Sequence, residues 1–115
     1  MRSRSADGER GSATAELAVA LPAVALVLAA CLGAVQLGAQ QVRLTDAAAD
    51  AARALGRGES ESSAVSIAHR VSGGGAELTS WHEDPFVCVA LSAPGAGVLS
   101  AVTLRAESCA VGGGL

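Results

Sequence analysis

The sequence predicts an α+β protein in which one long N-terminal helix precedes a small C-terminal region with a short helix and a β-hairpin. Three observations predict this class. An uncharged stretch runs from Leu17 to Val42, an alanine-rich segment with helical periodicity follows it, and two β-like runs lie near the C-terminus. The 115 residues are 50% hydrophobic but only 2% aromatic, which leaves little material for a large core. A self-contained globular enzyme is therefore not expected.

The N-terminal half is predicted to contain a leader and a membrane-spanning helix. Residues 1–11 are polar and rich in Gly, Ser and Arg, and we interpret them as a disordered leader peptide because they cannot form a core. Residues 12–42 are predicted to be a transmembrane helix. The uncharged part alone spans roughly 39 Å at 1.5 Å per residue, more than the ~30 Å hydrocarbon core of a bilayer.

Residues 43–56 are predicted to continue this helix in amphipathic form. Apolar residues recur at helical spacing along one stripe, namely Leu44, Ala48, Ala51 and Leu55. Charged residues follow another face. We expect one helix from about Ala13 to Leu55, with Gly56 as its stop.

Residues 57–115 are predicted to form a small extracytoplasmic α+β region. A polar linker leads to a short helix over Ala64–Val71, which is closed by a run of glycines. Two β-like runs, residues 85–91 and 101–106, are separated by a loop that contains Pro94, Gly95 and Gly97. Because two strands alone are marginal in water, they need a helix or a neighbouring subunit as cover.

Two cysteines in this region are candidates for a disulfide. Cys88 and Cys109 each lie in or beside a β-like run, and an extracytoplasmic location would favour a bond between them. Closing a loop of about 20 residues would contribute roughly 3 kcal/mol in the chain-entropy model. The alternative is that both are small buried apolar residues. Cys31 is interpreted as a packed thiol in the membrane.

No motif for catalysis, metal or cofactor binding is found. The segment Trp81-His82-Glu83-Asp84 lacks the spacing of metal ligands, and we interpret it as a solvated loop. The net charge of −3 gives no basic surface for nucleic acid. We expect a protein that is not an enzyme, with no cofactor, no metal site and no small-molecule substrate.

The junction between leader and apolar run carries the most informative motif. Gly11 ends the leader, and Glu16 is the fifth residue after it, directly before the uncharged stretch. This arrangement resembles the processing site of type IV prepilins and pseudopilins. Residues 11–42 as a whole resemble TadE-like proteins of tight-adherence pili, and the ending VTLRAESCA is similar to their β-rich tail.

The resemblance implies a minor pseudopilin-like structural component of a pilus or secretion system, cut after Gly11 by a prepilin peptidase. Ser12 would become the new N-terminus. Glu16 would set the register between subunits by pairing with the N-terminal amine of a neighbour. The implied partners are the peptidase, other pilin or pseudopilin subunits and the inner-membrane assembly platform. The short leader and this resemblance favour a cytoplasmic N-terminus and an extracytoplasmic C-terminal region.

Other interpretations of the same segment remain open at this point. Residues 28–31, LAAC, match a bacterial lipobox, which would make the chain a lipoprotein acylated at Cys31. The chain could also be an unprocessed single-pass membrane protein, with Glu16 marking the aqueous edge of its anchor. Small residues at four-residue spacing, including Ala25, Ala29 and Gly33, would allow close helix packing, although an Ala-rich composition can produce the same pattern.

Overall fold

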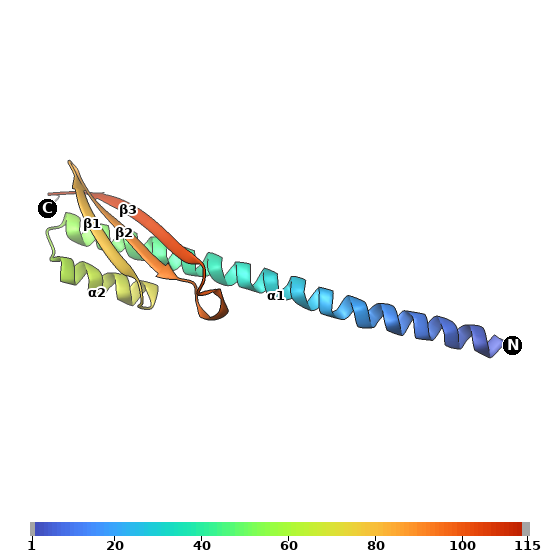
Figure 1. Cartoon of the computed structure of the whole chain (residues 1–115). Helices are drawn as coiled ribbons and strands as arrows, with labels where there is room; N and C mark the ends of the chain where they lie inside the picture. Colours follow the sequence, from blue (N-terminus) through green and yellow to red (C-terminus); the bar gives the residue numbers. More distant parts are fainter. Residues whose placement is uncertain (1, 114–115) are drawn as a thin grey trace. The chain divides into compact units, whose positions relative to one another are not determined.

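The computed structural model describes the backbone of residues 2–113 and the side chains of residues 11–113. Two helices are followed by a three-stranded antiparallel sheet (Figure 1). The predicted α+β class is confirmed. The chain divides into two compact units, residues 1–35 and residues 36–115.

The first helix, α1, extends from Arg2 to Gly56 and continues through Pro22. The long predicted helix is therefore present, but it begins before Ala13. The prediction of a disordered leader over residues 1–11 lies outside the fully described residues except at Gly11.

The glycine that ends α1 in the left-handed conformation is not the one predicted from the sequence. The helix stops at Gly56 as expected, but the left-handed residue is Gly58, with φ of 85°. The Gly58 N–H donates to the Leu55 carbonyl at 3.0 Å, and the Glu59 N–H donates to the Ala54 carbonyl at 3.1 Å. This pair of bonds is a Schellman motif, which satisfies carbonyls that the helix end would leave free.

The second helix, α2, spans Glu61–Ser72 and includes the predicted helical segment. Ser60 caps its N-terminus by accepting a hydrogen bond from the Ser63 N–H at 3.2 Å. Gly73, with φ of 91°, ends it in the left-handed conformation.

The sheet contains one strand more than the predicted hairpin. Strands β2 (Phe86–Pro94) and β3 (Thr103–Val111) correspond to the two predicted runs, and β1 (Glu77–Glu83) pairs with β2 on the other side. The interpretation of residues 81–84 as a solvated loop is therefore wrong for its first three residues, which end β1. Strand β1 carries polar side chains on both faces, so its sequence lacks the apolar alternation that marks a strand.

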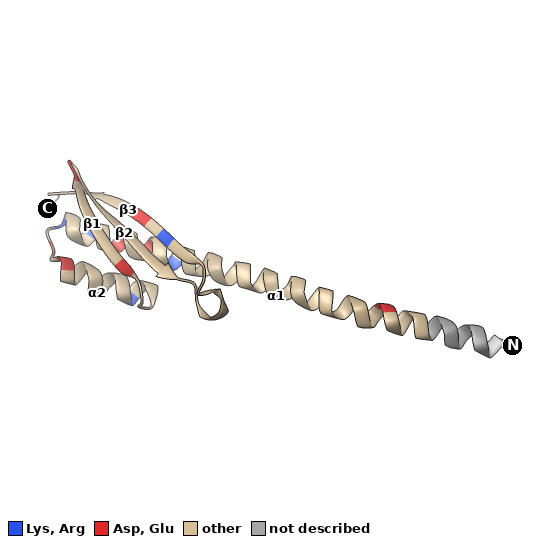
Figure 2. Ribbon diagram, in the orientation of Figure 1, with Lys and Arg blue, Asp and Glu red and all other residues tan. Residues whose placement is uncertain are grey.

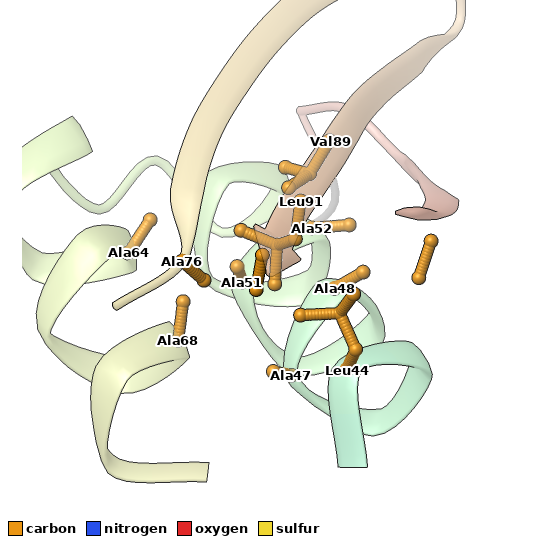
Figure 3. Close-up of a cluster of buried hydrophobic side chains, with 12 residues drawn as sticks. Leu44, Ala47, Ala48, Ala51, Ala52, Ala64, Ala68, Ala76, Val89 and Leu91 are labelled. Carbon is orange, nitrogen blue, oxygen red and sulfur yellow. The ribbon is translucent and has the colours of Figure 1, made fainter. Parts of the chain in front are cut away.

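The core of the second unit lies between the helices and one face of the sheet. Figure 3 shows side chains from α1, α2 and the sheet meeting around Leu91. The predicted stripe on α1 is confirmed, since Leu44, Ala48 and Ala51 are buried and Leu55 packs against the core. Most other members are alanines. The small side chains let the helices approach the sheet closely, but they leave only three large, fully buried side chains in this core, namely Leu44, Val89 and Leu91.

Candidate functional site

The predicted processing residues lie at the start of the part of α1 whose side chains are described. Gly11, Ser12 and Glu16 are all exposed. Glu16 is the only charged residue between Gly11 and Val42, and Figure 2 shows a single acidic band in this otherwise uncharged run. Among the side chains of residues 11–113, Glu16 forms no ion pair.

No side chain among residues 11–113 covers the apolar residues of the first unit. Every side chain from Gly11 to Leu32 is exposed, including large ones such as Val19 at 77% and Leu26 at 72%. The helix is long and apolar enough to cross a bilayer. An exposed apolar helix of this length is compatible with a single-pass membrane protein.

The small-residue positions lie along this exposed helix. Ala25 and Ala29 are exposed, and Gly33 is partly buried. Their four-residue spacing places them on one face of α1. Cys31 has a free, exposed thiol.

Near the start of the second unit, the side chains of two glutamines on α1 form hydrogen bonds with the backbone of the sheet region. The Gln40 side chain donates to the Pro94 carbonyl at 2.8 Å and accepts from the Ala96 N–H at 3.1 Å. Gln41 donates to the Arg105 carbonyl at 2.9 Å. Neither contact can be predicted from the sequence, because a glutamine in a helix carries no signal for a contact 54 or 64 positions away.

We expect the Gln40 contacts to hold the loop between β2 and β3 in place. Replacing Gln40 with Ala removes two hydrogen bonds and should lower the free energy of unfolding by about 1–2 kcal/mol. Amide hydrogen exchange in residues 95–102 should become faster. Gln36→Ala is the matched control, since Gln36 is exposed on the same helix. Unchanged exchange in the Gln40 variant would contradict the assignment.

The structure contains a disulfide between Cys88 and Cys109, the pair named from the sequence. The two residues are directly opposite one another on β2 and β3, and Trp81 of β1 is opposite Cys88 on the other side. These three residues lie on the sheet face that points away from the helices, because Val89, the neighbour of Cys88 along β2, faces the core and side chains alternate between faces. The side chain of Cys88 is nevertheless fully buried.

The histidines do not form a metal centre. His69 lies on α2, where its Nε2 is 3.2 Å from the Ala76 carbonyl oxygen. His82 lines a cavity of about 610 Å³ at the end of α1, together with Arg57, Asp84 and Phe86. Within the described residues, no group of three or more His, Cys, Asp or Glu side chains is arranged to hold a metal ion.

The comparison with protein families bears directly on the N-terminal region. Residues 11–53 match the family model described as TadE-like protein. The chain carries a TadE-like segment. This segment begins at Gly11, contains Glu16 and the uncharged run, and ends on the amphipathic part of α1. No curated protein and no solved structure matches the chain.

The match confirms the predicted resemblance over the TadE-like segment, residues 11–53. The C-terminal ending, which was also expected to resemble TadE-like proteins, lies outside the matched residues. The α2 helix and the sheet are likewise outside the TadE-like segment.

Proposed function

We propose that this chain is a minor pseudopilin-like structural or assembly component of a Tad-type pilus or secretion system, cut after Gly11 by a prepilin peptidase. The observation that supports this most is the family match, which starts at Gly11 and continues through the uncharged run. We propose a structural role without catalysis, because most of the exposed large hydrophobic side chains in the described part of the chain lie on α1.

The proposed cleavage site has features that suit a protease acting at the membrane surface. Gly11 precedes the uncharged run, and a Cβ built at this position would meet no atom within 4 Å. The protease must open the helix here into an extended form, and glycine opposes this least because it has no side chain. Cleavage would place a new ammonium group on Ser12, near the bilayer surface.

Glu16 is the proposed partner for such an ammonium group on a neighbouring subunit. It lies beside apolar side chains of α1, including Val19, Ala20 and Ala23. A carboxylate in apolar surroundings is unfavourable unless it is paired. A pair between Glu16 of one subunit and Ser12 of the next would offset that cost and fix the axial register of the helices.

The proposed orientation puts the N-terminus in the cytoplasm and residues 57–115 outside the inner membrane. The Cys88–Cys109 disulfide supports this, because disulfides persist mainly in oxidising compartments. The proposed partners are the prepilin peptidase, other pilin or pseudopilin subunits and the assembly platform. A lipoprotein cut before Cys31 fits less well, because α1 continues without interruption through Cys31 to Gly56.

Intact-mass analysis of the protein extracted from membranes tests the processing step. We expect a mature chain that starts at Ser12. Gly11→Val should reduce cleavage by at least about tenfold, which needs an increase of only about 1.4 kcal/mol in the barrier. Gly8→Val is the matched control for a glycine elsewhere in the leader. A lipidated Cys31 or an uncut chain in the wild type would refute processing after Gly11.

A further inference from the structure

The loop between β2 and β3 exposes apolar side chains at one end of the second unit. Val98, in the short helix η1 (Gly97–Leu99), is 98% exposed, and Val102 is 42% exposed. No charged residue occurs between Asp84 and Arg105. A solvent-exposed loop normally carries polar side chains, so the composition of residues 95–102 indicates a surface that meets something apolar.

The loop is folded on itself and satisfies much of its own backbone. The Gly95 N–H donates to the Val102 carbonyl at 2.7 Å, the Leu99 N–H to Ala96 at 3.1 Å, and the Val102 N–H to Leu99 at 3.0 Å. A Cβ at Gly95 would collide with the Leu99 backbone, so only glycine fits this turn. Internal pairing of backbone groups lowers the cost of moving a loop into an apolar medium.

Gln40 fixes this loop at the level where the uncharged run of α1 ends. Figure 1 shows the loop beside α1, and the two Gln40 hydrogen bonds hold Pro94 and Ala96 there. A ~30 Å hydrocarbon core takes about 20 helical residues, which cover about residues 20–39 when centred on the run Leu17–Val42. Gln40 and the attached loop would then lie at the boundary between the acyl chains and the headgroups.

The first charged residue after each apolar segment also suits a position at the boundary between the acyl chains and the headgroups. Arg43 is the first charge after the uncharged run, and it is exposed and in no ion pair among the side chains of residues 11–113. Arg105 is the first charge after the loop. Its carbonyl accepts from Gln41, which places its backbone beside the same turn of α1, while its guanidinium pairs with Glu107. An unpaired arginine directly beyond an apolar surface is suited to lipid phosphates.

We propose that residues 95–102 form a second membrane contact, with Val98 and Val102 inserted into the interface of the bilayer that α1 spans. The partner is a phospholipid surface. The contact would fix the height and rotation of the second unit above the membrane, because a helix alone leaves rotation about its axis free. This inference rests on the proposed membrane span of α1.

Quenching of tryptophan fluorescence by lipids with brominated acyl chains tests the contact. The full chain is reconstituted in phosphatidylcholine–phosphatidylglycerol vesicles, and Trp81→Phe removes its single tryptophan. Three second substitutions are then compared. Val98→Trp reports on the loop, Leu26→Trp on the span, and Phe86→Trp on the opposite end of the second unit. Phe86 lines the same cavity as Gly56, which lies about 24 Å along α1 from Gln40.

We expect about a twofold loss of fluorescence from the indole at position 98, at least as much at position 26, and little change at position 86. Quenching at position 26 with none at position 98 would overturn the loop contact and leave the span intact. No quenching at position 26 would refute the span, and with it the proposed function and this inference. A blue-shifted but unquenched indole at position 98 would mean that protein covers the loop, which also overturns the proposal.

Discussion

Replacing Glu16 with Gln should reduce recovery of the protein in sheared surface filaments by at least about tenfold. If Glu16 pairs with the Ser12 ammonium of a neighbouring subunit, the Gln variant leaves that ammonium without a counter-charge in an apolar interface. Breaking a buried pair in this way costs about 3–5 kcal/mol. Even a third of that range corresponds to about a tenfold change in an equilibrium constant.

The control variants separate the charge from the general shape of the helix. Glu16→Asp keeps the carboxylate and should retain part of the incorporation, while Ala20→Ser changes a nearby exposed position without altering charge. The Gln variant should still be found in the membrane at the wild-type level, since loss of a charge makes residence in lipid easier. Undiminished incorporation of this variant would remove the basis for the register-setting role.

Loss of the Cys88–Cys109 disulfide should strongly destabilise the second unit. The cysteines are 21 positions apart, and a closed loop of this length contributes roughly 3 kcal/mol in the chain-entropy model. For a domain of this size we expect the midpoint of thermal unfolding to fall by roughly 12–24 °C. The effect is large because the core around Leu91 consists mostly of alanines.

Alkylation and unfolding together measure this effect. Without reductant only Cys31 should react, since it is the free cysteine, and all three cysteines should react after reduction and denaturation. Fluorescence of Trp81 then follows unfolding of the Cys88→Ala/Cys109→Ala variant, with Cys31→Ala as the matched control. Three reactive thiols before reduction, or an unchanged midpoint in the double variant, would contradict the prediction.

The sequence predicts those parts of the fold that have a local pattern. The uncharged run, the apolar stripe around Leu44 and the helix over Ala64–Val71 all follow from periodicity and composition, and the structure confirms each as helix. Gly11 and Glu16 could be selected because they lie just before the uncharged run, and the family match covers both.

The features that were missed depend on contacts between distant parts of the chain. Strand β1 is held by pairing with β2, while its own sequence has polar residues on both faces and no apolar alternation. Gly56 was chosen as the helix stop, yet its lack of a side chain serves mainly to let Val111 approach, since a Cβ there would be 2.8 Å from the Val111 carbonyl oxygen. The left-handed position is Gly58. None of these roles has a signal in the neighbouring residues.

The hydrogen bonds of Gln40 also limit how far α1 can extend away from the second unit. Only the residues before this attachment are free to cross a bilayer or to pack lengthwise against other helices. From Ser12 to Gln40 that length is about 42 Å, and stretching it would require the loop between β2 and β3 to detach. Inserting four alanines between Val35 and Gln40 would therefore lengthen the helix before this attachment by about 6 Å while leaving the buried residues from Leu44 onward in place.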